Sequence, residues 1–295
     1  AIPTVLTMTV VPILGAGSSM ADYRIGFKWW ALIIAVVFVI SELVCVACVP
    51  ERPVACDEKP GKISDMFKAL FKNDQAMTVV VSIILVYTSL NICGNLVLYF
   101  FRFDVGNEGA YSIFAAVAFA AQVLVMMVIP LLRKRFSKSQ LFISGFIIQI
   151  AGFAVILIMA FAKLYTPQSW YILCLPGILI YLGYGMLNVI MTIFLSDSVD
   201  YGEVMNGTRE ESVIFSMQTF TVKLASGVAV FLAGLVVDCI HLDTAAAVQT
   251  QDTLDALRMW MTIPSVILRI VGIFVFKRFY KLDDTRMEEI KSKLN

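Results

Sequence analysis

Histidine is nearly absent from this 295-residue sequence, which contains one, His241. A single histidine supplies neither a His-based catalytic triad nor a His-rich metal site. Cysteine is sparse as well, and Cys45-x-x-Cys48 has no second pair with which to hold zinc. We interpret the cysteines as small apolar side chains. We therefore expect no metal site in this chain, no cofactor and no enzymatic activity. The six cysteines are Cys45, Cys48, Cys56, Cys93, Cys174 and Cys239.

Charged residues are also scarce, at 15% of the sequence, whereas 59% of the residues are hydrophobic and the mean hydropathy is +0.84. Soluble domains typically contain about 25% charged and about 45–50% apolar residues. The net charge of +1 gives no sign of a nucleic-acid partner, and no basic patch is interleaved with aromatic residues. The composition predicts an all-α polytopic membrane protein with the lipid bilayer as a partner.

Long apolar runs take the place of a soluble core. A helix that crosses the bilayer needs about 20 apolar residues, and suitable runs cover residues 27–49, 76–101, 109–132, 141–162, 170–195, 213–240 and 259–276. The run at 2–14 is too short, and Ala1 is followed by no signal-peptide features, so we expect a chain truncated at its N-terminus. The polar segments 197–211 and 241–257 are expected to be loops.

A long polar stretch separates the first full span from the rest, at residues 50–75. It contains an amphipathic piece at 63–71 that we expect to lie on the membrane surface. Sixteen of the 23 Lys and Arg residues fall on the side of this stretch and of the C-terminus. Because cytoplasmic loops carry the excess of Lys and Arg, we expect a multi-pass protein of the inner (plasma) membrane with both segments in the cytoplasm.

One charge stands inside the apolar run that begins at Val213. Lys223 lies roughly 15 Å along this expected helix, near the middle of a ~30 Å hydrocarbon layer. A lysine there is costly unless it faces protein or water. Gln218, Thr219 and Ser226 share one broad face of the helix with it. The pattern predicts a polar cavity lining, and the alternative is a lysine that snorkels or pairs with a buried carboxylate.

Other polar residues within expected spans have two interpretations each. Glu42 either takes part in ion coupling or faces the protein interior or the membrane surface. Asn91 and Asn95, four residues apart, either line the same cavity or form hydrogen bonds between helices. Arg269 is a second costly charge, which is either functional or paired with a carboxylate or a lipid headgroup.

Residues 200–223 contain a series of motifs that resembles a known transport family. In order, the matching residues are Asp200-Tyr201-Gly202-Glu203, Arg209, Glu211-Ser212, Ser216-x-Gln218-Thr219 and Lys223. They resemble the region around helices 10 and 11 of the glycoside–pentoside–hexuronide:cation symporters, the melibiose-permease-like branch of the major facilitator superfamily. The sequence Lys72-Asn73-Asp74-Gln75 also matches the family, at the end of its central loop.

The resemblance implies roles for individual residues. The family's helix 11 lines the sugar cavity, which assigns substrate binding to Gln218, Thr219 and Lys223. Asn188 faces the same region by analogy, at a place where the melibiose permease has an aromatic residue. The family's D-Y-G…R segment helps to close the cytoplasmic gate, and the residues implied here are Asp197, Asp200, Tyr201, Gly202, Glu203 and Arg209.

The resemblance also implies an architecture and a mechanism. Residues 1–49 correspond to the end of the N-terminal bundle (a helix 5 stub and helix 6), 50–75 to the cytoplasmic central loop, 76–280 to the C-terminal six-helix bundle and 281–295 to a cytoplasmic tail. The implied function is sugar:cation symport by alternating access. The coupling cation is Na⁺, H⁺ or Li⁺, and its acidic site belongs to earlier helices. The full-length protein is expected to be a monomer.

Other functions compete with sugar transport. Relatives of this branch move lysolipids, so a major facilitator for a lysolipid or another small solute is one alternative. A membrane-embedded enzyme is another, but it would depend on the carboxylates at 197–211, which fit gate ion pairs better. A non-functional fragment is the third.

Overall fold

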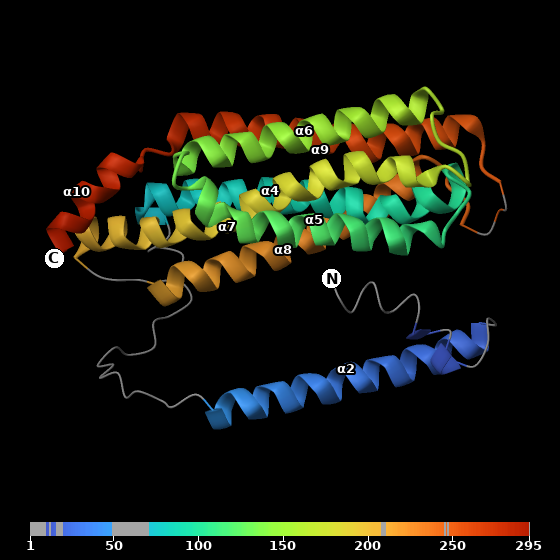
Figure 1. The fold of residues 1–295 in the computed structure, drawn as a ribbon, viewed down its shortest axis with the longest axis horizontal. Helices are drawn as coiled ribbons and strands as arrows, with labels where there is room; N and C mark the ends of the chain where they lie inside the picture. Colours follow the sequence, from blue (N-terminus) through green and yellow to red (C-terminus); the bar gives the residue numbers. More distant parts are fainter. Residues whose placement is uncertain are drawn as a thin grey trace. The chain divides into compact units, whose positions relative to one another are not determined.

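A computed structural model describes residues 10–11, 13–15, 20–48, 71–207, 211–244, 246 and 248–294. Every regular element in these ranges is a helix (Figure 1). Seven helices are long and apolar enough to cross a membrane. The expected all-α membrane fold is therefore confirmed for the described residues. The expected surface helix at 63–71 lies outside the described ranges, apart from the helical residue Phe71.

The chain forms two compact units, residues 1–61 and 62–295. In the first unit, α2 (Met20–Cys48) is the long helix. Residues 10–11 and 13–15 are helical as well, and the carbonyl of Val11 approaches α2 so closely that a Cβ at Gly26 would lie 2.1 Å from its oxygen. A glycine is required at this contact because no side chain fits there. Glu42 is exposed on α2.

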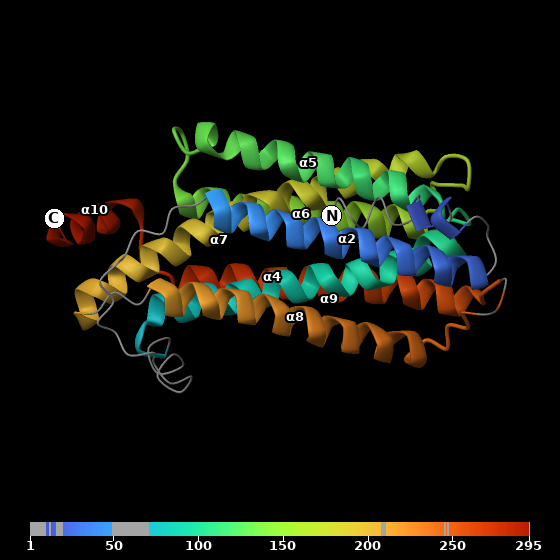
Figure 2. The same ribbon diagram turned by 90° about the horizontal axis from the view of Figure 1, so that it is seen from below.

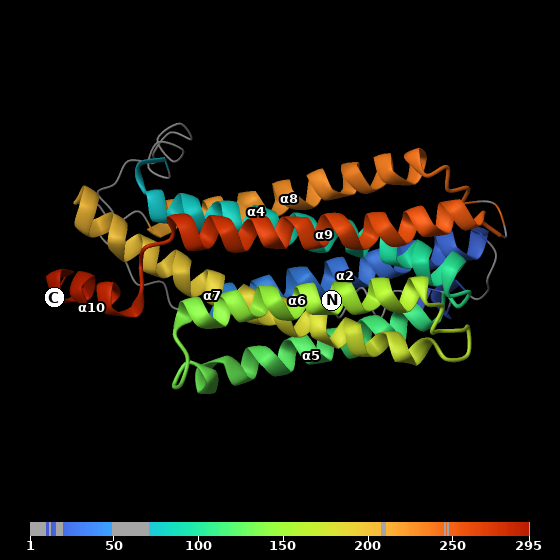
Figure 3. The same cartoon turned by 90° about the horizontal axis from the view of Figure 1, so that it is seen from above.

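The second unit is a bundle of six spans and a terminal helix. Its elements are α4 (Asp74–Tyr99), the π-helix η1 (Phe100–Asp104), α5 (Ala110–Leu132), α6 (Lys138–Phe161), the 3₁₀-helix η2 (Trp170–Leu173), α7 (Cys174–Asn206), α8 (Glu211–Cys239), α9 (Gln251–Phe279) and α10 (Asp284–Leu294). Two views from opposite sides show the spans side by side, with α5 and α8 at the two margins (Figures 2 and 3).

Helix α4 occupies a central position, since it packs against α7, α8 and α9, while α7 packs against α5 and α6. Glycines bring α6 and α7 together: a Cβ at Gly183 would lie 2.5 Å from the carbonyl oxygen of Gly145. Small residues at such contacts let helices approach closely in membranes. The close packing fixes α7 against α6, so that the polar residues of α7 are held in a defined register.

Two of the predicted boundaries are wrong. Residues 197–206 were expected to be a loop but form the last turns of α7. The helix continues through Gly202 and ends at Gly207, which adopts a left-handed conformation with φ 72°. The predicted loop 241–257 ends early as well, because the Thr250 hydroxyl accepts a hydrogen bond from the Thr253 amide and starts α9 at Gln251.

Candidate functional site

A polar cluster lies halfway along α4 and α7. The rings of Tyr87 on α4 and Tyr184 on α7 meet edge to face, with centroids 5.8 Å apart. Asn188 lies one turn beyond Tyr184 on the same face of α7. All three residues are half-buried. The structure thus places the predicted site residue Asn188 beside two tyrosines whose role the sequence did not indicate. Their hydroxyls and ring faces suit a ligand that has both polar and apolar surfaces.

Asn91 and Asn95 continue this polar face along α4. The Asn91 amide donates to the Tyr87 carbonyl, and the Asn95 amide donates to the Asn91 carbonyl, both at 2.7 Å. Their amide groups therefore bond within their own helix, and these contacts are not the interhelical bonds that were one expectation. Both side chains are half-buried, and each amide also carries an oxygen that accepts hydrogen bonds.

Lys223 and its polar neighbours lie on α8. The buried side of α8 is a stripe of mostly small residues, among them Thr221, Ala225 and Ala229, which faces the bundle. Lys223 and Thr219 are exposed and Gln218 is half-buried, so all three lie off this stripe. In the described part of the chain, Lys223 forms no ion pair with a carboxylate.

The predicted gate residue Asp197 lies in a buried ion pair. Its carboxylate pairs with Lys138 on α6, and both side chains are about 95% buried. Lys138 also lies 3.5 Å from Asp284 of α10, whose carboxylate is 3.2 Å from Arg133. Burial opposes ionisation of Asp284, but the hydrogen bond and charge of Arg133 hold its pKa below the usual value. The cluster joins α6, α7 and α10 at one end of the bundle.

The two motifs that carry the resemblance meet in space. The Asn73 side chain caps α4 and donates to the Ser198 carbonyl at 2.7 Å, across 125 residues of sequence. A Cβ at Gly202 would lie 2.8 Å from the Asn73 amide nitrogen, so glycine leaves room for this contact. The Tyr201 side chain also lies near the Asp74 carboxylate. Both motifs thus join the ends of α4 and α7.

The remaining predicted gate residues can be placed only in part. Asp200 and Glu203 are half-buried on the last turns of α7, where both form interactions. Arg209 lies outside the described residues. The partners Lys138 and Asp284 were missed, although the basic sequence at 133–138 was a signal for Lys138. Nothing in the sequence around Asp284 indicated its partners, because 151 residues separate it from Arg133 and 146 separate it from Lys138.

A second ion-pair cluster lies at the opposite end of the bundle. Arg258 on α9 binds Asp104 of η1 through two nitrogens and Asp255 through a third, at 2.7 Å. The Tyr165 hydroxyl donates to Asp104 as well. Burial and the neighbouring carboxylate raise the pKa of Tyr165 above its usual value. The cluster fastens the π-helix to α9 and to the α6–α7 connection.

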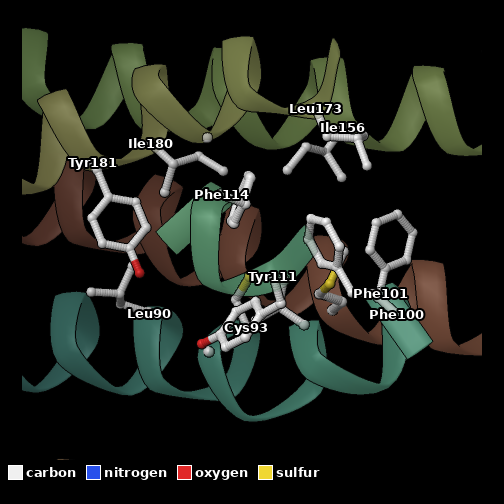
Figure 4. Close-up of a pocket in the computed structure, with 14 residues that line it drawn as sticks. Leu90, Cys93, Phe100, Phe101, Tyr111, Phe114, Ile156, Leu173, Ile180 and Tyr181 are labelled. Atoms are coloured by element: carbon white, nitrogen blue, oxygen red, sulfur yellow. The ribbon is translucent and has the colours of Figure 1, made fainter. Parts of the chain in front are cut away.

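An apolar cavity of about 30 Å³ lies between these clusters, bordered by α4, α5 and α7 (Figure 4). Leu90 and Cys93 of α4, Tyr111 of α5 and Tyr181 of α7 are among the lining residues. Within the described ranges, no cluster of three or more His, Cys, Asp or Glu residues is placed to hold a metal ion.

Together, the apolar spans, the mid-helix polar faces and the ion pairs at both ends define a polytopic helical membrane protein of the transporter class. A sequence model of the MFS/sugar transport protein family matches residues 1–284. The match covers more than half of the chain, and the chain belongs to this family. The family consists of transporters, not enzymes.

Several curated relatives match most of this chain. The uncharacterized symporter YjmB of Bacillus subtilis (strain 168) is 24% identical over 85% of this chain and 54% of its own length. The raffinose carrier protein of Pediococcus pentosaceus is 24% identical over 98% and 45%, respectively. The isoprimeverose transporter of Lactiplantibacillus pentosus is 26% identical over 94% and 56%. The chain thus spans about half the length of these relatives.

Proposed function

We propose that this chain forms one wall of the sugar site in a sugar:cation symporter. The observation that carries the proposal is the set of polar side chains that α4, α7 and α8 carry within their apolar spans. Family membership supports it, because the family is one of sugar transport. The names of relatives, a raffinose carrier and a lactose permease among them, agree with this substrate class.

In this proposal, three helices contribute to sugar recognition. Gln218, Thr219 and Lys223 on α8 bond sugar hydroxyls, as does Asn188 on α7, and Asn91 and Asn95 extend the lining along α4. Lys223 also supplies the countercharge for carboxylates of the full-length protein. Tyr184, one turn from Asn188, presents an aromatic ring. A tyrosine ring packs against the apolar face of a pyranose while its hydroxyl bonds the polar edge.

The gate completes the proposed mechanism. Asp197, Asp200, Tyr201, Gly202 and Glu203 on α7, with Arg209, close the cytoplasmic side when the two bundles rock against each other. The buried Lys138–Asp197 pair keeps the end of α7 fixed to α6. The coupling cation is Na⁺, H⁺ or Li⁺, and Glu42 is a candidate for a part in coupling. The loop at 50–75 and the C-terminus lie in the cytoplasm.

The test is transport by the full-length protein in liposomes. Radiolabelled α-galactosides, β-galactosides and a xylose-containing disaccharide are offered under an inward gradient of Na⁺, H⁺ or Li⁺. We expect at least one sugar to accumulate above its external concentration, and an ionophore that collapses the gradient to abolish accumulation. Reconstituted protein that accumulates none of the sugars under any gradient would contradict the proposal.

A further inference from the structure

Arg269 lies at the centre of the bundle, halfway along α9, and none of its surface is exposed. Its Nε donates to the Gln149 side-chain oxygen on α6 at 2.8 Å, and its Nη1 donates to the Ser89 hydroxyl on α4 at 2.5 Å. Nη1 also donates to the carbonyl of Ser265, one turn earlier on α9. The guanidinium lies 4.5 Å from the ring centre of Phe153. One side chain thus connects three helices.

The charge of Arg269 is not balanced by a carboxylate. Among the described residues, the ion pairs of buried cations join Arg258 to Asp104 and Lys138 to Asp197, and none involves Arg269. Its Nη2 has no hydrogen-bond partner. Of the two interpretations of Arg269, pairing with a carboxylate or a lipid headgroup does not hold among the described residues. A guanidinium that keeps its charge without an ion pair is costly, so its neutral contacts need an explanation.

The contacts of Arg269 lead directly to the candidate sugar face. Ser89 lies between Tyr87 and Asn91 in the sequence of α4, two residues from each. Gln149, the other partner, donates its amide to the Ile180 carbonyl of α7 at 3.1 Å, next to Tyr181 and one turn before Tyr184. Arg269 therefore holds both α4 and α7 at the level of their polar residues, from the opposite side of these helices.

The cavity shows how close these anchors are to the polar face. Leu90 follows Ser89 and Tyr181 follows Ile180, and both line the cavity. Figure 4 shows the Tyr181 ring pointing from α7 toward Leu90 of α4 at one end of the cavity. A change in the spacing of the two anchors would alter this contact and the Tyr87–Tyr184 contact together.

We propose that Arg269 is a positioning residue, which sets the spacing of α4 and α7 at the sugar site through Ser89 and through Gln149. The inference rests on the proposed function for the identity of the ligand. Arginine suits this task because its planar fork donates in several fixed directions at once. Lysine keeps the charge but offers a compact ammonium without this fork, so it does not hold both partners in the same geometry.

The first experiment compares Arg269→Lys with Arg258→Lys in the full-length protein. Both variants replace a buried arginine of α9, but Arg258 belongs to the end cluster with Asp104. We expect Arg269→Lys to raise the KM for sugar about tenfold, as the weakening of one charged hydrogen bond would. We expect the maximal rate to change less than twofold and Arg258→Lys to leave KM unchanged. An unchanged KM in Arg269→Lys, or an equal rise in both variants, would overturn the proposal.

Milder variants keep the test open if Arg269→Lys fails to fold. Ser89→Ala removes the contact with α4, and Gln149→Leu removes the contact with α7, while Arg269 stays in place. Each is expected to raise KM severalfold, by less than the arginine variant, because one link remains. Normal KM values in both folded variants would overturn the proposal.

A second readout separates this inference from the transport function. Gly94 of α4 and Thr192 of α7 are both exposed positions. Spin labels attached there report the distance between the two helices by electron paramagnetic resonance. We expect a broader or shifted distance distribution in Arg269→Lys and not in Arg258→Lys. This result, in a protein that transports no sugar, would support the positioning role and refute the transport proposal. An unaltered distribution would overturn the positioning role whatever the transport result.

Discussion

The proposal gives Lys223 a chemical role. A substitution of this one residue tests that role. Lys223→Ala in the full-length protein removes the charge near the middle of α8, and we expect it to abolish concentrative sugar uptake, because the countercharge or hydrogen-bond donor of the site is lost. The measurement is uptake against a gradient in liposomes. Leu224→Ala is the matched control, since Leu224 is the next residue and is also exposed. Accumulation at the wild-type level in Lys223→Ala would refute the assignment.

At the residue scale, the sequence indicated which polar groups are unusual but not what they contact. Lys223 was identified from its position inside an apolar run, whereas Asn188 and Asp197 were implied by the family resemblance. The partner of Asp197 was not, because Lys138 lies 59 residues away and only the packing of α6 on α7 brings them together. Arg269 was recognised as costly, yet its neutral partners Ser89 and Gln149 follow from three-helix packing that no local pattern encodes.

The contact between α6 and α7 depends on the absence of a side chain at Gly183. Gly183→Ala would place a Cβ 2.5 Å from the backbone oxygen of Gly145, which cannot move without separating the helices. We expect the substitution to destabilise the bundle by about 1–3 kcal/mol, as overpacking does. The measurement is thermal unfolding of the purified full-length protein in detergent, where the midpoint temperature should fall.

The same substitution on a neighbouring helix provides the control. Gly227 on α8 has no atom within 4 Å of an added Cβ. Gly227→Ala should therefore leave stability unchanged or raise it by about 0.4–1 kcal/mol, because alanine restricts the unfolded chain. If both variants lose the same stability, the loss does not arise from the α6–α7 contact. The explanation given for Gly183 would then be wrong.

At the element scale, hydropathy predicted the spans well because each one is a long apolar run bounded by polar segments. Boundaries were predicted poorly where a helix continues beyond the apolar layer. The last turns of α7 contain Asp197, Asp200 and Glu203, and such a composition is typical of loops. These turns are helical because Asn73 and α10 pack against them, and the helix ends only at Gly207. The stabilising contacts are tertiary, so the sequence alone did not predict them.

At the scale of the whole molecule, the two ends of the bundle differ in a way that bears on its orientation in the membrane. The end formed by α10 and the last turns of α7 carries a basic cluster, Arg133, Lys134, Arg135 and Lys138. The ion-pair cluster at the opposite end has one arginine, Arg258, and two carboxylates, Asp104 and Asp255. An excess of Lys and Arg marks the cytoplasmic side. The bundle therefore has a definite predicted orientation, with α10 in the cytoplasm.

Cysteine labelling tests this orientation in the full-length protein freed of its native cysteines. Gln168 lies in the exposed connection before α7 and Asn206 lies at the exposed far end of that helix. At a rise of about 1.5 Å per residue, a 33-residue helix is about 50 Å long, enough to place its ends on opposite sides of the bilayer. A membrane-impermeant thiol reagent should label Gln168→Cys in whole cells and Asn206→Cys only in inverted vesicles. The reverse pattern would mean that the basic cluster faces outward, and the gate assigned to the end of α7 would then lie on the wrong side for cytoplasmic release of the sugar.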